Sequence, residues 1–142
     1  MKTPRGISKI PVHLYGGVLL FVKTRKDFEK AYKHLHGTEY PDDTADGAGL
    51  TCREPVFKDS TPYYLCGVFD SKLETVVHES AHCATIIMKR AGINSHDDDG
   101  ESFCYLLEHI FMEINKKVFA QPKKKSVILA ASETSFQPLE NV

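Results

Sequence analysis

The sequence predicts an α+β fold in one small domain. Short apolar and β-branched runs bounded by Gly or Pro are typical of strands, and they occupy residues 10–23, 48–57 and 63–69. Apolar residues recur at helical spacing in three further segments, residues 25–36, 71–90 and 99–119. A chain of 142 residues is long enough for about one domain. We expect residues 1–120 to form this domain, and residues 121–142 to be a C-terminal tail, either flexible or adding an edge strand.

Composition narrows the class of protein. Hydrophobic residues make up 42% and charged residues 26% of the chain, as in ordinary globular proteins. The formal net charge is −1, from 18 basic and 19 acidic residues. Domains that bind nucleic acid through bulk positive charge are strongly basic. We therefore expect no nucleic-acid partner.

The apolar stretches and the cysteines of the chain indicate its cellular compartment. The longest apolar stretch, from Ile10 to Val22, is too short to span a membrane. It loosely resembles a signal peptide, but Gly16 and Gly17 interrupt it and no small-residue cleavage site follows. The four cysteines form no C-x-x-C pair. We expect a cytoplasmic protein with reduced thiols and no membrane contact.

In the N-terminal half, residues 10–23 read as a hairpin or bent strand around the two adjacent glycines. The following helix carries Phe28, Tyr32 and Leu35 on one face and stops at Gly37. A polar, acidic stretch then forms a loop to residue 46. Further strands follow it, and Pro62 begins the last of them.

Two helices end the domain. Ser71, three residues before Glu74, predicts a capping box for the first of them, and Gly92 ends it. Its expected apolar stripe consists of Leu73, Val77, Ala81, Ala84, Ile87 and Met88. An acidic turn over residues 97–100 leads into the second helix. The expected buried side of that helix consists of Phe103, Leu106, Leu107, Ile110, Phe111, Ile114 and Val118.

The first of these helices contains an H-E-x-x-H motif, formed by His78, Glu79 and His82. Residues four apart lie about 40° apart around a helix, so both imidazoles can reach one metal ion. Glu79 lies about 100° from His78, where it can accept a proton from a metal-bound water without ligating the metal. Both histidines lie opposite the expected apolar stripe. The helix can therefore bury one side and present the other to a cleft.

Two histidines alone make a weak site, so a third ligand is needed. Glu101, which 18 residues separate from His82, is the candidate. One turn on, Tyr105 could donate a hydrogen bond to a developing oxyanion, and two turns on, Glu108 could orient a histidine. Each has a plainer reading: Glu101 completes a capping box with Asp98 as N-cap, Tyr105 is an interface aromatic, and Glu108 is surface charge.

The motif followed by a glutamate after 18 residues resembles the gluzincin class of zinc metallopeptidases. The segment around Gly100, Glu101 and Tyr105 is also similar to small zincin-like proteins encoded by bacteriophages. The resemblance implies a minimal zincin core: a small, twisted, mostly antiparallel sheet packed on the H-E-x-x-H helix and a following ligand helix. It implies zinc bound by His78, His82 and Glu101, with Glu79 as the base. The chain departs from large gluzincins in having Gly100 before the glutamate and no room for their second helical domain.

The resemblance implies a zinc metallopeptidase whose metal-activated water attacks a peptide bond. In zincins an edge strand lines the cleft and pairs with extended substrate, and residues 63–69 are the candidate strand. The alternative is a catalytically silent phage accessory protein that binds a host or phage protein partner with a structural zinc. A domain without any metal is the third reading. If phage-encoded, the protein would work in the host cytoplasm.

Overall fold

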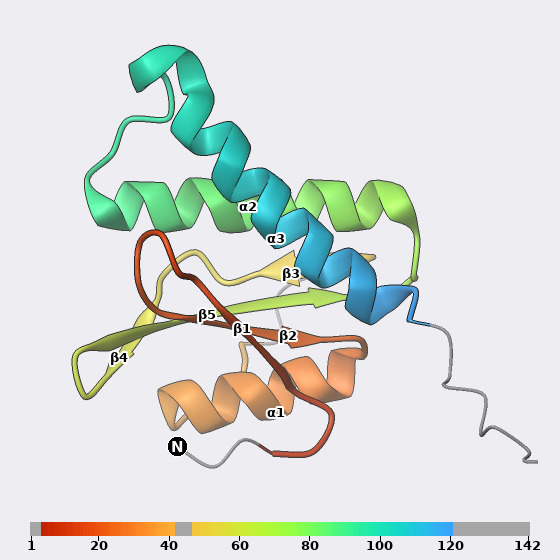
Figure 1. Cartoon of the computed structure of the whole chain (residues 1–142). Helices are drawn as coiled ribbons and strands as arrows, with labels where there is room; N and C mark the ends of the chain where they lie inside the picture. The colour runs from red at the N-terminus through yellow and green to blue at the C-terminus, as the bar shows by residue number, and fades with distance from the viewer. Residues whose placement is uncertain (1–3, 42–46, 121–142) are drawn as a thin grey trace, which may run out of the picture.

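The computed structural model describes residues 4–41 and 47–120. It confirms the α+β class: five strands in one mixed sheet and three α-helices (Figure 1). A single turn of 3-10 helix, η1, precedes the last helix. In chain order the elements are β1 (Ser8–Pro11), β2 (Val18–Val22), α1 (Arg25–His36), β3 (Gly49–Thr51), β4 (Val56–Lys58), β5 (Thr61–Val68), α2 (Leu73–Ala91), η1 (Asp97–Gly100) and α3 (Glu101–Val118).

The sheet is built around β5. Its strand order is β1-β2-β5-β3, and β4 also pairs with β5. β1 and β2 form the expected antiparallel hairpin, β2 and β5 are parallel, and both β3 and β4 run antiparallel to β5. The single strand expected over residues 48–57 is instead two short strands. They pair with opposite ends of β5, because Thr51 lies opposite Cys66 whereas Val56 lies opposite Tyr63.

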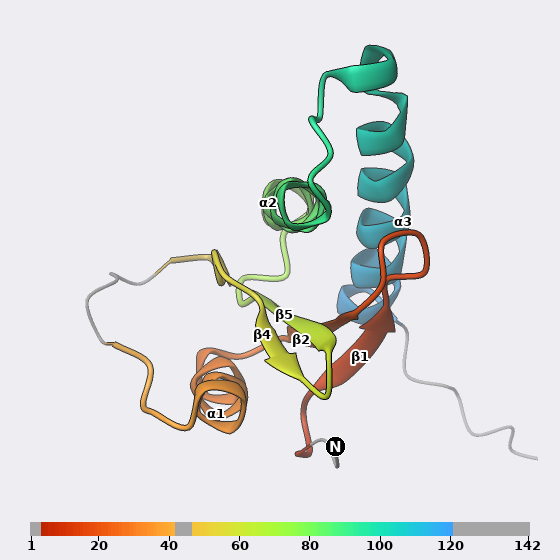
Figure 2. The same cartoon turned by 90° about the vertical axis from the view of Figure 1, so that its left-hand side faces the viewer.

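Helices cover both faces of the sheet (Figure 2). α1 packs on one face with Leu20, Val22 and Leu65, and α2 and α3 pack on the other with Leu19 and Cys66. Successive residues of β2 and β5 therefore enter different cores, since side chains alternate across a strand. Both strands are apolar nearly throughout because both of their faces are buried.

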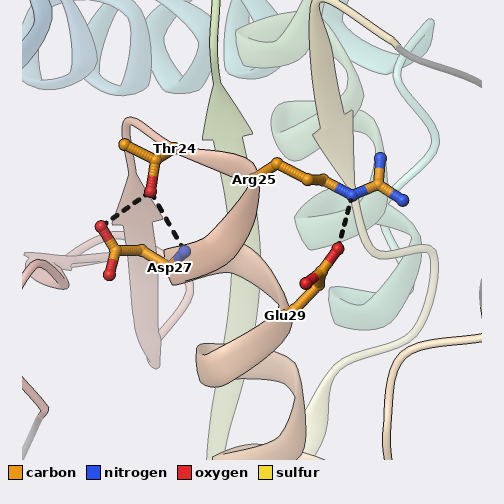
Figure 3. Close-up of polar contacts among 4 residues, drawn as sticks. All are labelled: Thr24, Arg25, Asp27 and Glu29. Carbon is orange, nitrogen blue, oxygen red and sulfur yellow. Dashed lines mark hydrogen bonds and ion pairs between the residues drawn. The ribbon is translucent and has the colours of Figure 1, made fainter.

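α1 has the helix ends that its sequence predicts. At its start the hydroxyl of Thr24 accepts a hydrogen bond from the backbone N–H of Asp27 and donates one to the Asp27 carboxylate (Figure 3). Arg25 and Glu29, one turn apart, form an ion pair at 3.2 Å. Gly37 ends the helix with a φ of 77°, a conformation that favours glycine. α1 thus spans residues 25–36, as expected.

The capping box predicted for α2 is wrong. Its N-cap is Lys72, and Ser71 has a φ of 55° outside the helix. Asp70 instead holds the turn that precedes the helix: its carboxylate accepts hydrogen bonds from the backbone N–H of Lys72 and the hydroxyl of Thr75. Gly92 ends the helix in the left-handed region, as predicted.

The expected apolar stripe of α2 is only partly right. Ala84, Ile87 and Met88 are buried, but the side chains of Leu73 and Val77 are 51% and 47% exposed. The buried face is instead rotated toward two polar residues that have hydrogen-bond partners. The Ser80 hydroxyl donates to the Val76 carbonyl at 2.7 Å, and Glu79 accepts from Thr51. A pattern of apolar residues alone does not reveal such a face.

The turn into α3 differs from the expected one. Asp98 and Asp99 adopt positive φ angles within η1, and the N-cap of α3 is Gly100. Asp98 is therefore not the N-cap, although its carboxylate accepts hydrogen bonds from the backbone and the hydroxyl of Ser102. Glu101 is the first residue of α3, so the capping-box interpretation of Glu101 is wrong.

α3 buries Leu106, Ile110 and Ile114 against α2 and the sheet. Neither α3 nor any other helix in the described ranges combines the length and the apolar character that a membrane span requires. The tail beyond residue 120, including the proposed edge strand there, lies outside the described residues.

The rotated face of α2 can be tested with neighbouring valines. Val76 is fully buried and Val77 is half-exposed. We expect Val76→Ala to lower the free energy of unfolding by about 2 kcal/mol, because it removes two buried methyl groups. Val77→Ala should change it by less than about 0.5 kcal/mol. Urea unfolding measures both, and equal losses would contradict the observed face.

Candidate functional site

The two histidines of the motif lie side by side on α2. Their Nε2 atoms are 3.1 Å apart, and their rings meet at 79° with centroids 4.7 Å apart. Both side chains are exposed, on the side of the helix opposite its buried face. The predicted pairing of His78 and His82 on one face is confirmed. At this distance the two nitrogens either share a proton in a hydrogen bond or are placed to share a cation.

Glu79 is buried beside this pair, with only 5% of the residue exposed. Its Oε2 accepts a hydrogen bond of 2.6 Å from the Thr51 hydroxyl on β3. Gly49, two residues earlier on the same strand, leaves room for the carboxylate. A Cβ at position 49 would lie 2.7 Å from the Glu79 Cγ and 2.9 Å from the Gly67 carbonyl oxygen. A buried carboxylate requires such partners, since desolvating a charge is costly.

Cysteine side chains lie close to the contact between Thr51 and Glu79. Cys83 Sγ lies 3.8 Å from the Thr51 hydroxyl, and Cys66 lies opposite Thr51 in the sheet. Burial, and next the neighbouring Cys83, raises the pKa of Cys52 to about 12. The pKa of Cys66 is also raised, first by its hydrogen bond with Cys83 and then by burial. Cys52 and Cys66 are therefore protonated at neutral pH and are poor nucleophiles.

A cleft of about 650 Å³ is lined by the His pair, Glu79, Thr51 and Cys52. One wall is α2, with His78, Glu79 and His82, and the floor is β3. The opposite wall comes from the end of α1 and the segment after it. That wall contributes Tyr32, His36, Tyr40 and Pro41. The cleft thus runs around the outer edge of the sheet, from the α2 face to the α1 face.

This edge strand is not the expected one. The strand around residues 63–69 is interior, because β5 pairs with β2, β3 and β4. In the described part of the chain β3 ends the strand order, and it lines the cleft. The sequence places a strand in both regions, but only the pairing shows which of them is the edge.

α3 and α1 lie on different sides of α2 (Figure 2), and the cleft is lined by α2, by β3 and by the end of α1 with residues 40–41. The residues of α3 are consequently not among those that line the cleft: Glu101 is exposed, and Tyr105 is 62% exposed. Glu108 is exposed on the same helix. His109 faces the hairpin instead, with its Nε2 3.1 Å from the Pro11 carbonyl oxygen. The structure brings His78, Glu79 and His82 together but does not bring α3 to them.

A zinc ion fits this donor set in part. Zinc takes four ligands, and three of them come from the protein in catalytic sites. The His78 and His82 nitrogens fit two of these positions. Within residues 4–41 and 47–120, no three His, Cys, Asp or Glu side chains gather in a way that could hold a metal. Glu101 as the third ligand stays a prediction.

Several residues of the cleft carry no motif and were missed in the sequence. Gly49 and Thr51 belong to the site only because β3 runs beneath α2. The sequence around these two residues does not predict that packing. The aromatic wall could have been suspected from the sequence, since Tyr32 and His36 are four residues apart on a helix.

Neither a protein-family model nor a curated protein nor a solved structure matches this chain.

The pKa of His36 gives a test of the aromatic wall. Burial, and secondly the charge of Lys58, lowers this pKa below its ordinary value. The unfolded chain therefore takes up a proton below about pH 6.5 more readily than the folded chain does. Stability is retained above that pH and is lost as the pH falls toward the lowered pKa. His36→Phe, which keeps a ring on Tyr32, should reduce this loss.

Urea unfolding at about pH 7.5 and about pH 5.5 measures the difference. His34→Phe is the matched control, because His34 is exposed on the same helix. It should show the same loss as the wild type. An equal loss in wild type and His36→Phe would show that the environment of His36 does not disfavour its charged form.

Proposed function

We propose that this protein is a zinc-dependent hydrolase that acts on peptide bonds, with the metal on His78 and His82 and with Glu79 as general base. One observation supports it above all: two imidazole nitrogens lie 3.1 Å apart beside a buried carboxylate in one cleft. Two histidine nitrogens this close together could hold one zinc ion, which would then need further ligands.

Each side chain of the site has a separate role in the proposed reaction. Bound zinc supplies a Lewis acid that lowers the pKa of water and polarises a carbonyl. His78 and His82 would hold it where α2 lines the cleft. Glu79 accepts a proton from the attacking water and passes it to the leaving amine. Thr51 holds Oε2 of Glu79, which leaves Oε1 for the proton.

β3 offers the substrate a backbone to pair with. Phe69 N–H donates to the Ala48 carbonyl, and Cys52 N–H donates to the Leu65 carbonyl. In an antiparallel pair these groups alternate in direction, so the N–H and C=O of Gly49 and Thr51 point away from β5. An extended peptide added along this edge would lie beside the His pair.

The second candidate is a catalytically silent protein that binds a peptide or protein partner and keeps a structural metal. Two observations favour it. No third protein ligand gathers at the His pair in the described residues, and the Glu79 carboxylate is already engaged by Thr51. The two candidates share the metal and differ in the role of Glu79.

Metal content tests both candidates. We expect protein purified without chelator to contain about one zinc per chain by mass spectrometry, and His78→Ala and His82→Ala to contain almost none. His34→Ala, a change on an exposed histidine of α1, should retain the metal. Glu101→Ala decides the third ligand: weaker zinc binding would show that α3 approaches the pair. A metal-free wild type that also binds no added zinc would refute both.

Turnover tests the role of Glu79. Glu79→Gln preserves shape and the Thr51 contact but removes the base. If the protein is a hydrolase, this variant should retain zinc and cleave a synthetic peptide library about 100-fold more slowly or worse. Cleavage is followed by mass spectrometry of the fragments. Equal cleavage by both proteins would exclude Glu79 as base. A wild type that binds zinc and cleaves nothing in the library would favour the binding protein.

A further inference from the structure

The wall of the cleft opposite the His pair is a cluster of aromatic rings. Tyr32 and His36 stack with centroids 3.9 Å apart and an interplanar angle of 15°. Tyr40 meets Tyr32 edge-on at 4.9 Å and Phe28 edge-on at 5.3 Å. The zinc chemistry proposed above uses none of these rings.

The rings are fixed before any ligand arrives. Tyr32 and His36 are one turn apart on α1, and the left-handed turn at Gly37 leads the chain back to Tyr40. Phe28, which is fully buried, supports Tyr40 from the core side. Tyr32, His36 and Tyr40 themselves are only half-buried and line the cleft. A ligand would therefore meet a preorganised aromatic surface, with the Arg25 guanidinium 5.2 Å from the centroid of the Tyr40 ring, and preorganisation lowers the entropy cost of binding.

The strand at the floor connects this wall with the His pair. Thr51 reaches Glu79 on the α2 face, whereas Leu50 packs with the cluster of α1, which includes Tyr32 and Tyr40. An extended peptide paired with β3 follows the same alternation, because successive side chains point to opposite faces. Alternate side chains of that peptide would lie toward the His pair and toward the aromatic wall.

We propose that Tyr32, His36 and Tyr40 form a subsite for an aromatic side chain of an extended peptide lying along β3. The position of this side chain relative to the scissile bond rests on the proposed function, but the binding itself does not. An aromatic ring fits this wall because it can stack on, or meet edge-on, rings that already do so with each other. The lowered pKa of His36, caused first by burial, keeps this ring neutral at pH 7 and so adds no charge to the wall.

The test measures binding without turnover. The full chain carrying Glu79→Gln is labelled with ¹³C at its Tyr and His rings and titrated with N-acetyl-phenylalanine methylamide. The ring signals of Tyr32, His36 and Tyr40 should shift, and the alanine methylamide should bind at least about tenfold more weakly. Phenylalanine binding no tighter than alanine binding, or shifts confined to other rings, would overturn the proposal.

Variants locate the binding. Tyr32→Leu keeps an apolar side chain but removes a ring, and should weaken binding of the phenylalanine amide about tenfold. Tyr40→Leu should do the same, which covers the case in which one variant folds poorly. Phe57→Leu, on an exposed aromatic residue of β4 that does not line the cleft, is the matched control and should bind normally. Unchanged affinity in both folded ring variants would refute the subsite.

The outcome is separable from that of the hydrolase proposal. Binding is measured with and without zinc, and the subsite predicts the same ring shifts in both. If the amide binds there but no peptide is cleaved, the subsite stands and the hydrolase fails. If peptides are cleaved with no preference for aromatic residues and the amide does not bind, the subsite fails and the hydrolase stands.

Discussion

The contact between Glu79 and β3 is the constraint on which the site depends. A carboxylate that is almost fully buried is tolerated only with hydrogen-bond partners, and Thr51 supplies one at 2.6 Å. This contact fixes how closely β3 approaches α2, and Gly49 permits the approach because it has no Cβ. It also fixes the rotation of α2. With Glu79 turned inward toward the strand, His78 and His82 are turned outward, where their nitrogens meet at the mouth of the cleft.

The same contact makes the cleft two-sided. β3 is short and pairs on one side only with β5 in the described structure, so its outer backbone edge faces the cleft. On one face of the strand Thr51 contacts α2 through Glu79, and on the other face Leu50 packs with the cluster of α1. The cleft along β3 therefore has the polar side chains of α2 on one side and the aromatic side chains of α1 on the other, although these lie on opposite faces of the sheet. The peptide proposed to pair with β3 would direct its alternate side chains to these two walls in turn.

The sequence predicted those features that depend on neighbouring residues alone, such as helix ends and the face on which a side chain lies. Gly37 and Gly92 end their helices as glycine in the left-handed region should, and the four-residue spacing of the motif histidines is enough to place them on one face. The rest depends on contacts between distant segments. Burial of Glu79 and Ser80 follows from hydrogen bonds that apolar periodicity does not register, so the predicted stripe included the exposed Leu73 and Val77. The edge strand, likewise, is defined by pairing and not by composition.

The turn before α3 is the clearest case of this limit, and it bears on function. Asp98 and Asp99 take positive φ angles, which are uncommon for residues other than glycine, and Gly100 caps the helix. This turn leads into α3, which lies on a different side of α2 from α1 (Figure 2). Sequence spacing alone allows Glu101 to return to the histidines, whereas the observed turn does not bring it there. A metal held by His78, His82 and Glu101 would therefore require this turn to rearrange, whereas the Glu79 carboxylate is already held by Thr51. In the proposed hydrolase, the Glu79 carboxylate is held in advance by Thr51 whereas a third metal ligand is not in place, so activity would depend first on metal binding.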